Sequence, residues 1–170
     1  MEGFRMGRGP WNSLHSVVKR IAATSWASKV LSRILHRLDR PILQLTRGRA
    51  SLTGWLTGLP IISLTARGAK SGQPRTLPLI AVPDGEKLVL IASSYGRPRH
   101  PAWYHNLKAH PECQVTWNGR TRTYRAQEAK GPERERYWRL AVQAYPGYQR
   151  YQERVHPRRI PVLVLTPVEE

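Results

Sequence analysis

Apolar positions in the first quarter of the chain recur at the spacing of an amphipathic helix. They form two groups, Leu14, Val17, Val18 and Ile21, then Val30, Leu31, Ile34, Leu35 and Leu38. Lys and Arg fill the opposite side, and Pro41 ends the pattern. It predicts a basic amphipathic helix, either continuous or broken into two at residues 24–28. Residues 44–59 contain three glycines and are typical of a linker.

From residue 61 onward the periodicity changes to that of β-strands. Apolar or alternating runs predict strands at 61–65, 76–82, 87–93, 112–117, 121–128 and 161–166. A turn at 83–85 and the dipeptide Asn118-Gly119 predict hairpins, and Pro78 predicts an edge strand or a bulge. Helices are expected at 100–109 and 131–145, with a short helix or turn up to residue 155. Hairpin-connected strands with few helices favour an α+β fold built on a small antiparallel barrel.

The balance of charge narrows the kinds of partner. The 170 residues carry 28 Lys and Arg against 11 Asp and Glu, a net charge of +17. Residues 61–126 hold ten basic and three acidic side chains, whereas the part after them is nearly balanced. The partner is therefore expected to be anionic: nucleic acid, acidic lipid or a phosphorylated small molecule.

Cysteine and histidine positions argue against a metal centre. The single cysteine, Cys113, excludes an internal disulfide and a cysteine cluster, and it favours an intracellular protein. His100, His105 and His110 are five residues apart, so successive imidazoles on a helix point about 140° apart and cannot share one metal. No metal site is predicted. No run is long and apolar enough for a membrane-spanning helix.

A basic loop between the first two predicted strands is a candidate anion site. It holds Gly68, Gly72, a hydroxyl and three cations in the sequence RGAKSGQPR, residues 67–75. Glycines permit unusual backbone angles, so exposed N–H groups can converge on an anion. The same residues are equally typical of a solvated basic hairpin.

Two later segments combine small and aromatic side chains. Residues 92–94 are small, Trp103 offers a flat wall, and Asn106 can donate and accept hydrogen bonds at the edge of a planar ring. Alternatively, Trp103 and Leu107 are both core residues, since they lie one helical turn apart and can pack on the same side. Three tyrosines either form an aromatic gate with phenol donors or cover the end of the barrel: Tyr145, Tyr148 and Tyr151.

Together, these three segments resemble the deazaflavin-dependent nitroreductase family. Its members are split β-barrel proteins that use coenzyme F420, an 8-hydroxy-5-deazaflavin with a phosphorylated oligoglutamate tail. The resemblance rests on KSGQPR at 70–75, HPAWYHNL at 100–107 and YPGYQRY at 145–151, and it covers about residues 61–167. The chain is accordingly divided into a basic helix and linker, residues 1–59, and a split-barrel domain, residues 60–170.

The resemblance also implies roles for individual residues. One group is expected to bind the cofactor around its phosphate and acidic tail: Arg67, Lys70, Ser71, Gly72, Pro74, Arg75 and Pro78. Those expected to line the deazaflavin are Ala92, Ser93, Ser94, Trp103, Tyr104 and Asn106. The three tyrosines would face the substrate, with Tyr148 as the proton donor or orienting group.

The sequence departs from the family pattern at three places. Ala69 stands where an arginine is usual, Leu77 where a polar residue is common, and Tyr95 where the family has a glycine near the ring. Arg67 can take over the missing charge, and Tyr95 is expected to narrow the pocket. Substrate choice is the property most affected by these changes.

The expected activity is hydride transfer from reduced F420 to an electron-poor acceptor: a quinone, a nitroaromatic or an activated enone. FMN is the alternative cofactor, because related split barrels use either. A non-catalytic carrier of flavin or deazaflavin is a second alternative. Nucleic-acid binding is disfavoured, because the aromatic residues form no stacking platform on alternating strand positions.

The N-terminal helix has two interpretations. A basic amphipathic helix can lie on anionic lipid, which would suit a lipophilic quinone and place a cytoplasmic protein peripherally on the inner face of the cell membrane. Alternatively, the helix packs across the barrel and shows its basic side to solvent. The oligomeric state is left open.

Overall fold

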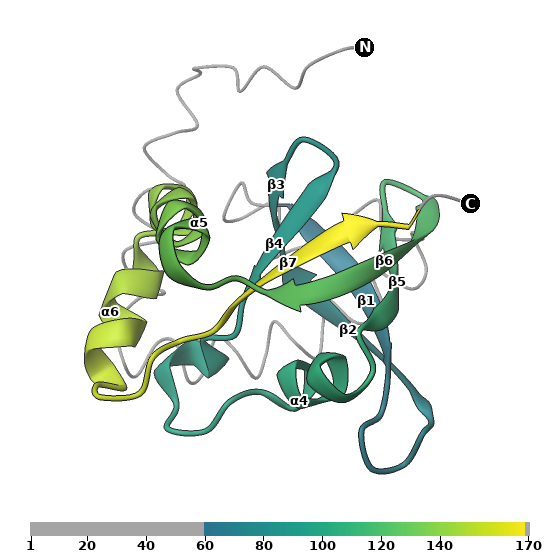
Figure 1. Cartoon of the computed structure of the whole chain (residues 1–170), viewed down its shortest axis with the longest axis horizontal. Helices are drawn as coiled ribbons and strands as arrows, with labels where there is room; N and C mark the ends of the chain where they lie inside the picture. The colour runs from purple at the N-terminus through teal and green to yellow at the C-terminus, as the bar shows by residue number, and fades with distance from the viewer. Residues whose placement is uncertain (1–59, 169–170) are drawn as a thin grey trace.

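The computed structural model describes residues 60–168, which form seven strands and three α-helices (Figure 1). The strands are β1 (Ile61–Arg67), β2 (Pro74–Ile80), β3 (Val82–Asp84), β4 (Lys87–Ile91), β5 (Glu112–Trp117), β6 (Arg120–Glu128) and β7 (Val162–Pro167). The helices are α4 (Ala102–Ala109), α5 (Gly131–Ala144) and α6 (Gly147–Arg154), and a single 3-10 turn, η1, spans Ser94–Gly96.

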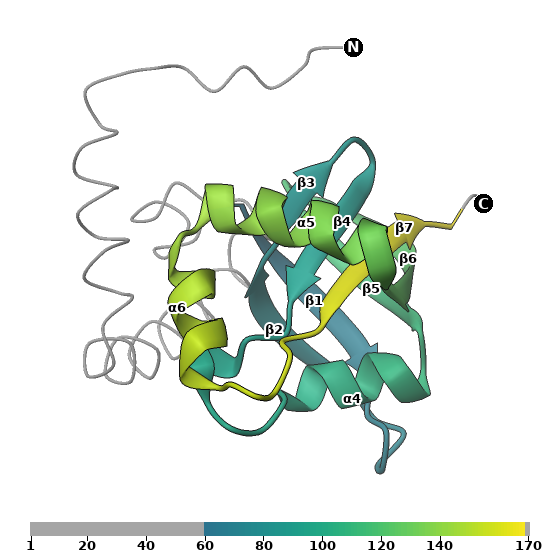
Figure 2. The same cartoon turned by 60° about the vertical axis from the view of Figure 1, so that its left-hand side comes forward.

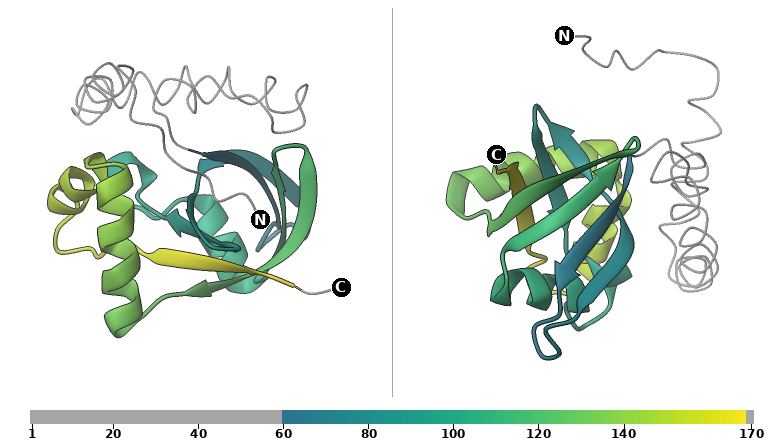
Figure 3. Two further views of the ribbon diagram at one scale, coloured as in Figure 1. Left: turned by 90° about the horizontal axis from the view of Figure 1, so that it is seen from above. Right: turned by 90° about the vertical axis from the view of Figure 1, so that its right-hand side faces the viewer.

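All seven strands belong to one antiparallel sheet in the order β2-β1-β5-β6-β7-β4-β3. The sheet curls on itself, and α4 lies beneath one end of the curl. On the outside, α5 packs near β3, β4 and β7, and α6 lies against α5 and η1 (Figure 3). Leu77 and Leu79 of β2 pack against the same cluster as Leu88 and Leu90 of β4, so the two ends of the sheet approach each other. The result is a split barrel.

Strands β4 and β7 are buried on both faces, which explains their uninterrupted apolar sequences. Leu88 and Leu90 of β4 point into the barrel, whereas Val89 and Ile91 point outward to α5 and α6. The strand β7 repeats this alternation at residues 162–165. Burial on both sides requires apolar side chains at every position rather than at every second one.

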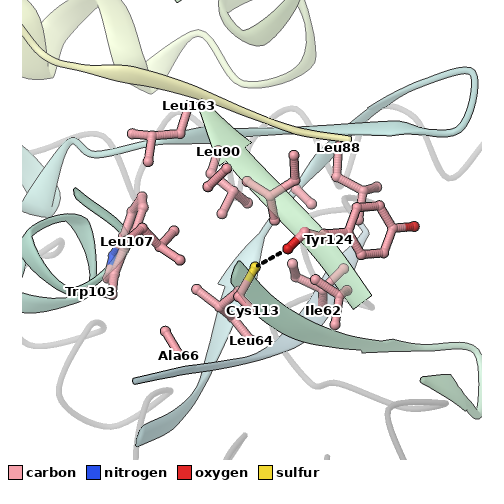
Figure 4. Close-up of a cluster of buried hydrophobic side chains, with 14 of the residues drawn as sticks. Ile62, Leu64, Ala66, Leu88, Leu90, Trp103, Leu107, Cys113, Tyr124 and Leu163 are labelled. Atoms are coloured by element: carbon pink, nitrogen blue, oxygen red, sulfur yellow. Dashed lines mark hydrogen bonds between the residues drawn. The ribbon is translucent and has the colours of Figure 1, made fainter. Parts of the chain in front are cut away.

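The core inside the barrel joins five strands to α4 (Figure 4). Trp103 and Leu107 enter it from α4, which confirms the one-turn spacing as a core pattern. The thiol of Cys113 donates to the carbonyl oxygen of Tyr124 at 3.6 Å, and burial raises the pKa of this thiol to about 12. Cys113 is therefore a packing residue and remains a thiol at neutral pH.

Most predicted elements are confirmed, with shifted boundaries. β2 is an edge strand, as Pro78 indicates, and Asn118 and Gly119 make the β5–β6 turn with φ of 49° and 77°. The turn predicted at 83–85 is wrong by one to two residues. Asp84 pairs with Lys87, so a separate short strand, β3, precedes a two-residue turn. The predicted N-terminal helix and linker lie outside the described residues.

Within the described range, no helix is long and apolar enough to cross a membrane.

Candidate functional site

The basic loop joins β1 to β2 and projects below α4 in the view of Figure 2. Gly68 N–H donates to the carbonyl oxygen of Gln73 at 2.9 Å, and Gly72 N–H donates to that of Gly68 at 2.8 Å. Gly72 takes a φ of 67°, a conformation that favours glycine. These bonds close a compact turn that presents Lys70, Ser71 and Arg75 to solvent.

The cations of this loop have no carboxylate partner within residues 60–168. Six ion pairs occur there, and the carboxylates that they engage belong to Asp84, Glu86, Glu112, Glu128 and Glu135. None of these pairs includes Arg67, Lys70 or Arg75. An exposed cluster of unneutralised cations on a fixed hairpin is suited to binding an anion.

Asn106 connects the loop to α4. Its side-chain oxygen accepts a hydrogen bond from the backbone N–H of Ala69 at 3.0 Å, across 37 residues of sequence. Asn106 was predicted to meet the edge of a ring, which stays a prediction, and in this structure its oxygen positions the basic loop. The amide NH₂ of Asn106 is still available to a ligand.

The sheet register divides the predicted phosphate-binding residues between two faces. Arg75 lies opposite Ala66, whose side chain is in the barrel core, so Arg75 shares the inner face. Arg67 lies opposite Pro74 on the outer face. Pro74 and Pro78 share that face, because side chains alternate along a strand.

A shallow depression of about 420 Å³ lies on the outer face beside Arg67. Its lining comes from four strands and the β1–β2 turn: Thr65, Ala66, Arg67, Gly72, Pro74, Glu112, Cys113, Gln114 and Thr123. The guanidinium of Arg67 lies close to Gly72, so it borders the basic loop from the side opposite Arg75. The sequence did not reveal this division, because it depends on strand register.

The end of β4 carries the small residues predicted to lie against a ring. Ala92 is fully buried and donates its N–H to the carbonyl oxygen of Pro161 at 3.0 Å. Ser93 is 8% exposed. Three consecutive residues then adopt positive φ: Ser94 at 51°, Tyr95 at 57° and Gly96 at 70°. Left-handed backbone is costly for the two residues that carry a Cβ.

Tyr104 is engaged in a polar network. Its hydroxyl donates to Glu128 at 3.0 Å, and Lys108 donates to the same carboxylate oxygen at 3.0 Å. Burial and the hydrogen bond to Glu128 raise the pKa of Tyr104. The ring of Tyr104 also packs against those of His100 and His105. Tyr104 thus links α4 to β6, and its ring contacts both histidine rings at an angle.

The three tyrosines of the YPGYQRY segment form a buried cluster. All are at most 5% exposed, and the hydroxyls of Tyr145 and Tyr151 lie 3.1 Å apart. The ring of Tyr148 meets that of Tyr145 edge-on, with centroids 5.1 Å apart. A Cβ at Gly147 would collide with the ring of Tyr145, so the glycine is needed for this packing. Burial raises the pKa of all three phenols, and all three therefore keep their protons.

Two arginines that the sequence analysis missed hold the segment between β4 and α4. Arg154 donates to the carbonyl oxygen of Tyr95 at 3.3 Å. Arg158 donates to the carbonyl oxygen of Arg97 at 2.7 Å and contacts Nδ1 of His100 at 2.9 Å. These contacts join residues about 60 positions apart, so no local pattern indicates them. They fix the loop that carries Ser93 and Ser94.

No group of three or more His, Cys, Asp or Glu within residues 60–168 is arranged to hold a metal ion. The candidate functional residues lie in three places: the basic loop, the β4 end and the tyrosine cluster.

Comparisons with known proteins identify the family of the chain. The sequence model of a family described as F420H(2)-dependent quinone reductase matches residues 37–167. An F420H(2)-dependent quinone reductase of Mycobacterium tuberculosis is 34% identical over 145 residues, which cover 83% of this chain and 95% of that protein.

Two solved structures are also similar. An F420-H2 dependent reductase, FDR-A, is 42% identical with a TM-score of 0.59, over 63% of this chain and 94% of that one. A second structure, described as a domain-swapped dimer, is 37% identical with a TM-score of 0.61, over 83% of this chain and 97% of that one.

Proposed function

Because the chain belongs to the F420H(2)-dependent quinone reductase family, we propose that it transfers a hydride from reduced F420 to a quinone. Bound F420 supplies the hydride chemistry, while the protein supplies binding, orientation and local charge. The observation that carries the proposal is the cluster of cations on the β1–β2 loop, which lack carboxylate partners among the described residues.

The basic loop would hold the phosphate and the acidic tail of the cofactor. Lys70, Ser71 and Arg75 are all exposed, and they combine two fixed charges with a hydroxyl donor. Asn106 supports them by anchoring the loop to α4. Arg67, Gly72, Pro74 and Pro78 would contribute at the margin of this site, because the register places Arg67 and both prolines on the outer face.

The ring of the cofactor would lie at the end of β4. Ala92, Ser93 and Ser94 have short side chains that permit close approach, and Trp103 closes the neighbouring part of the barrel core. Arg154 and Arg158 position this loop through backbone carbonyls. Tyr104 would support the site through its bond to Glu128 rather than by direct contact.

Tyr148 would act on the acceptor as a hydrogen-bond donor, beside Tyr145 and Tyr151. Its pKa is raised by burial and by the neighbouring Tyr151 and Tyr95, so the phenol is a weaker acid than an exposed tyrosine. A weaker acid transfers its proton less readily but still donates a hydrogen bond to a developing anion. We therefore assign Tyr148 the orienting role, with the proton reaching the reduced quinone from solvent.

The proposal is tested by anaerobic oxidation of reduced F420 with three acceptor classes. We expect turnover with menadione to exceed turnover with a nitroaromatic compound and with an activated enone at equal concentration. Turnover with any acceptor excludes a carrier that only binds deazaflavin. Binding of F420 without oxidation by any acceptor would contradict the reductase function and support the carrier.

A membrane role for the N-terminal part is a separate prediction, since residues 1–59 lie outside the described residues. We propose that they form a basic unit distinct from the split barrel and associate with anionic lipid near a lipophilic quinone. Flotation of the full chain and of a chain without residues 1–45 on anionic vesicles tests this. If the full chain does not float with the anionic vesicles at low salt, the proposed membrane association is wrong.

A further inference from the structure

Helix α4 makes polar contacts on two opposite sides. Tyr104 and Lys108 face β6, where both donate to the same carboxylate oxygen of Glu128, each at 3.0 Å. Asn106 faces the basic loop and accepts the N–H of Ala69 at 3.0 Å. At about 100° per residue, Asn106 lies roughly 200° from Tyr104 around the helix axis. The helix is therefore held from two opposite directions.

The buried side of α4 lies between these polar contacts. Trp103 and Leu107 point from this side into the barrel core. Apolar packing is non-directional, whereas hydrogen bonds require a defined distance and angle. The helix has only eight residues, and its N-cap Pro101 makes no side-chain capping bond. The polar contacts on its two sides therefore set its rotation about its own axis.

Glu128 is the fixed point for one of these two sides. It lies at the end of β6, opposite Leu163 of β7 in the sheet. Its side chain is 26% exposed and forms an ion pair with Lys108. Burial raises the pKa of Glu128, but the hydrogen bonds from Lys108 and Tyr104 outweigh burial and hold the pKa below 4.5. The carboxylate is therefore charged at neutral pH, which makes it a strong acceptor for both donors.

We propose that Glu128 is a positioning residue for the basic loop: by fixing the rotation of α4, it places the oxygen of Asn106 where it holds the N–H of Ala69. Lys70 and Ser71 follow Ala69 directly, so the bond at Ala69 sets where their side chains are presented. This inference rests on the proposed binding of F420 at the loop. Glu128 acts through α4 and not through contact with the cofactor.

The direction of the change in affinity separates positioning from simple electrostatics. Removing the negative charge of Glu128 makes the protein more positive, so electrostatics alone would tighten binding of the anionic cofactor. Loss of positioning should weaken binding instead. Glu128→Ala removes both hydrogen bonds and should raise the Kd for F420 about fivefold, whereas Glu128→Gln keeps an acceptor for Tyr104 and should raise it about twofold. Glu133→Gln is the matched control, because it removes the same charge from an exposed position on α5, and it should leave the Kd within about 1.5-fold.

Two measurements test whether the effect passes through Asn106. In Asn106→Ala protein, adding Glu128→Ala should change the Kd for F420 less than about twofold, because the contact that Glu128 controls is already absent. Amide hydrogen exchange of the full chain without cofactor gives a readout that does not depend on binding. The Ala69 amide should exchange at least about fivefold faster in Glu128→Ala protein. The Gly72 amide, which donates to Gly68 within the loop, should stay within about twofold, whereas a general loss of stability would speed both amides alike.

The outcomes separate this role from the proposed function. Unchanged or tighter F420 binding by folded Glu128→Ala protein, or an equal loss with and without the Asn106 side chain, would overturn the role of Glu128 and leave F420 binding at the loop intact. If no protein binds F420, the proposed function is wrong, and the exchange of Ala69 alone decides on Glu128. Thermal melting shows whether the variants are folded. If Glu128→Ala does not fold, the same criteria apply to Glu128→Gln and Tyr104→Phe, which each remove one of the two contacts.

Discussion

Neutralising the basic loop should weaken F420 binding without weakening the fold. The changes are Lys70→Gln and Arg75→Gln, singly and together. Both side chains are exposed, and neither takes part in an ion pair among the described residues. Their removal should therefore change the free energy of unfolding by less than about 0.5 kcal/mol.

The expected loss of affinity follows from the charge interactions. Two unit charges 4 Å apart in water interact by about 1 kcal/mol, and a charged hydrogen bond contributes about 1.5–3 kcal/mol. Each substitution should cost about 1–2 kcal/mol of binding free energy, or roughly a 5- to 30-fold rise in Kd. Arg67→Gln should cost less, because Arg67 lies on the outer face.

The assay is a fluorescence titration with oxidised F420 at two salt concentrations. Arg139→Gln is the matched control, since it removes the same charge from an exposed position on α5. The double variant should lose most of the salt dependence of binding, because the remaining contacts are less electrostatic. Equal losses in Arg139→Gln and Arg75→Gln would refute a local site and assign the effect to net charge.

Three further predictions concern the tyrosine cluster, the α4 anchor and the β4–α4 loop. Tyr148→Phe should lower kcat at least tenfold with less than a threefold change in F420 Kd, as expected for a group that acts on the acceptor; equal losses of both would show that the role is misassigned. Asn106→Ala should weaken F420 binding about fivefold, because it removes the bond to Ala69. In a protein that already carries Lys70→Gln, the same substitution should change the Kd for F420 little. The pKa of His100 is lowered from 6.5 by burial and by Arg158, so the unfolded chain binds this proton more readily and stability should fall as pH drops below 6.5. Thermal melting of His100→Gln should show a weaker pH dependence in that range, and an unchanged dependence would contradict this assignment.

The strands and most helices could be predicted because their patterns are local. The alternation in β5 and β6 and the Asn118-Gly119 turn each depend on neighbouring residues. The apolar runs of β4 and β7 were recognisable as strands by length and by β-branched content. The extra strand β3 was missed because it spans only Val82–Asp84 and its pairing with β4 depends on a turn one residue further on.

The composition of the candidate site was predictable, but its arrangement was not. The loop sequence indicated an anion site, yet only the register shows that Arg67 and Arg75 lie on opposite faces. The bond from Ala69 to Asn106 and the contacts of Arg158 cross 37 and about 60 residues of sequence, and no periodicity encodes such long-range contacts. The spacing of the three tyrosines was compatible with an aromatic gate to the substrate and with a cover over the end of the barrel. In the structure, all three residues are buried, with less than 6% of their surface exposed.

The central claim is that the basic loop and the β4 end bind a deazaflavin with an anionic tail. The most direct test is a parallel fluorescence titration of the full chain with oxidised F420 and with FMN. The account predicts micromolar binding of F420 and binding of FMN at least about tenfold weaker, because only F420 carries the oligoglutamate that extends over the cations. Tighter binding of FMN would make the protein an FMN-dependent reductase, and binding of neither cofactor would contradict the account.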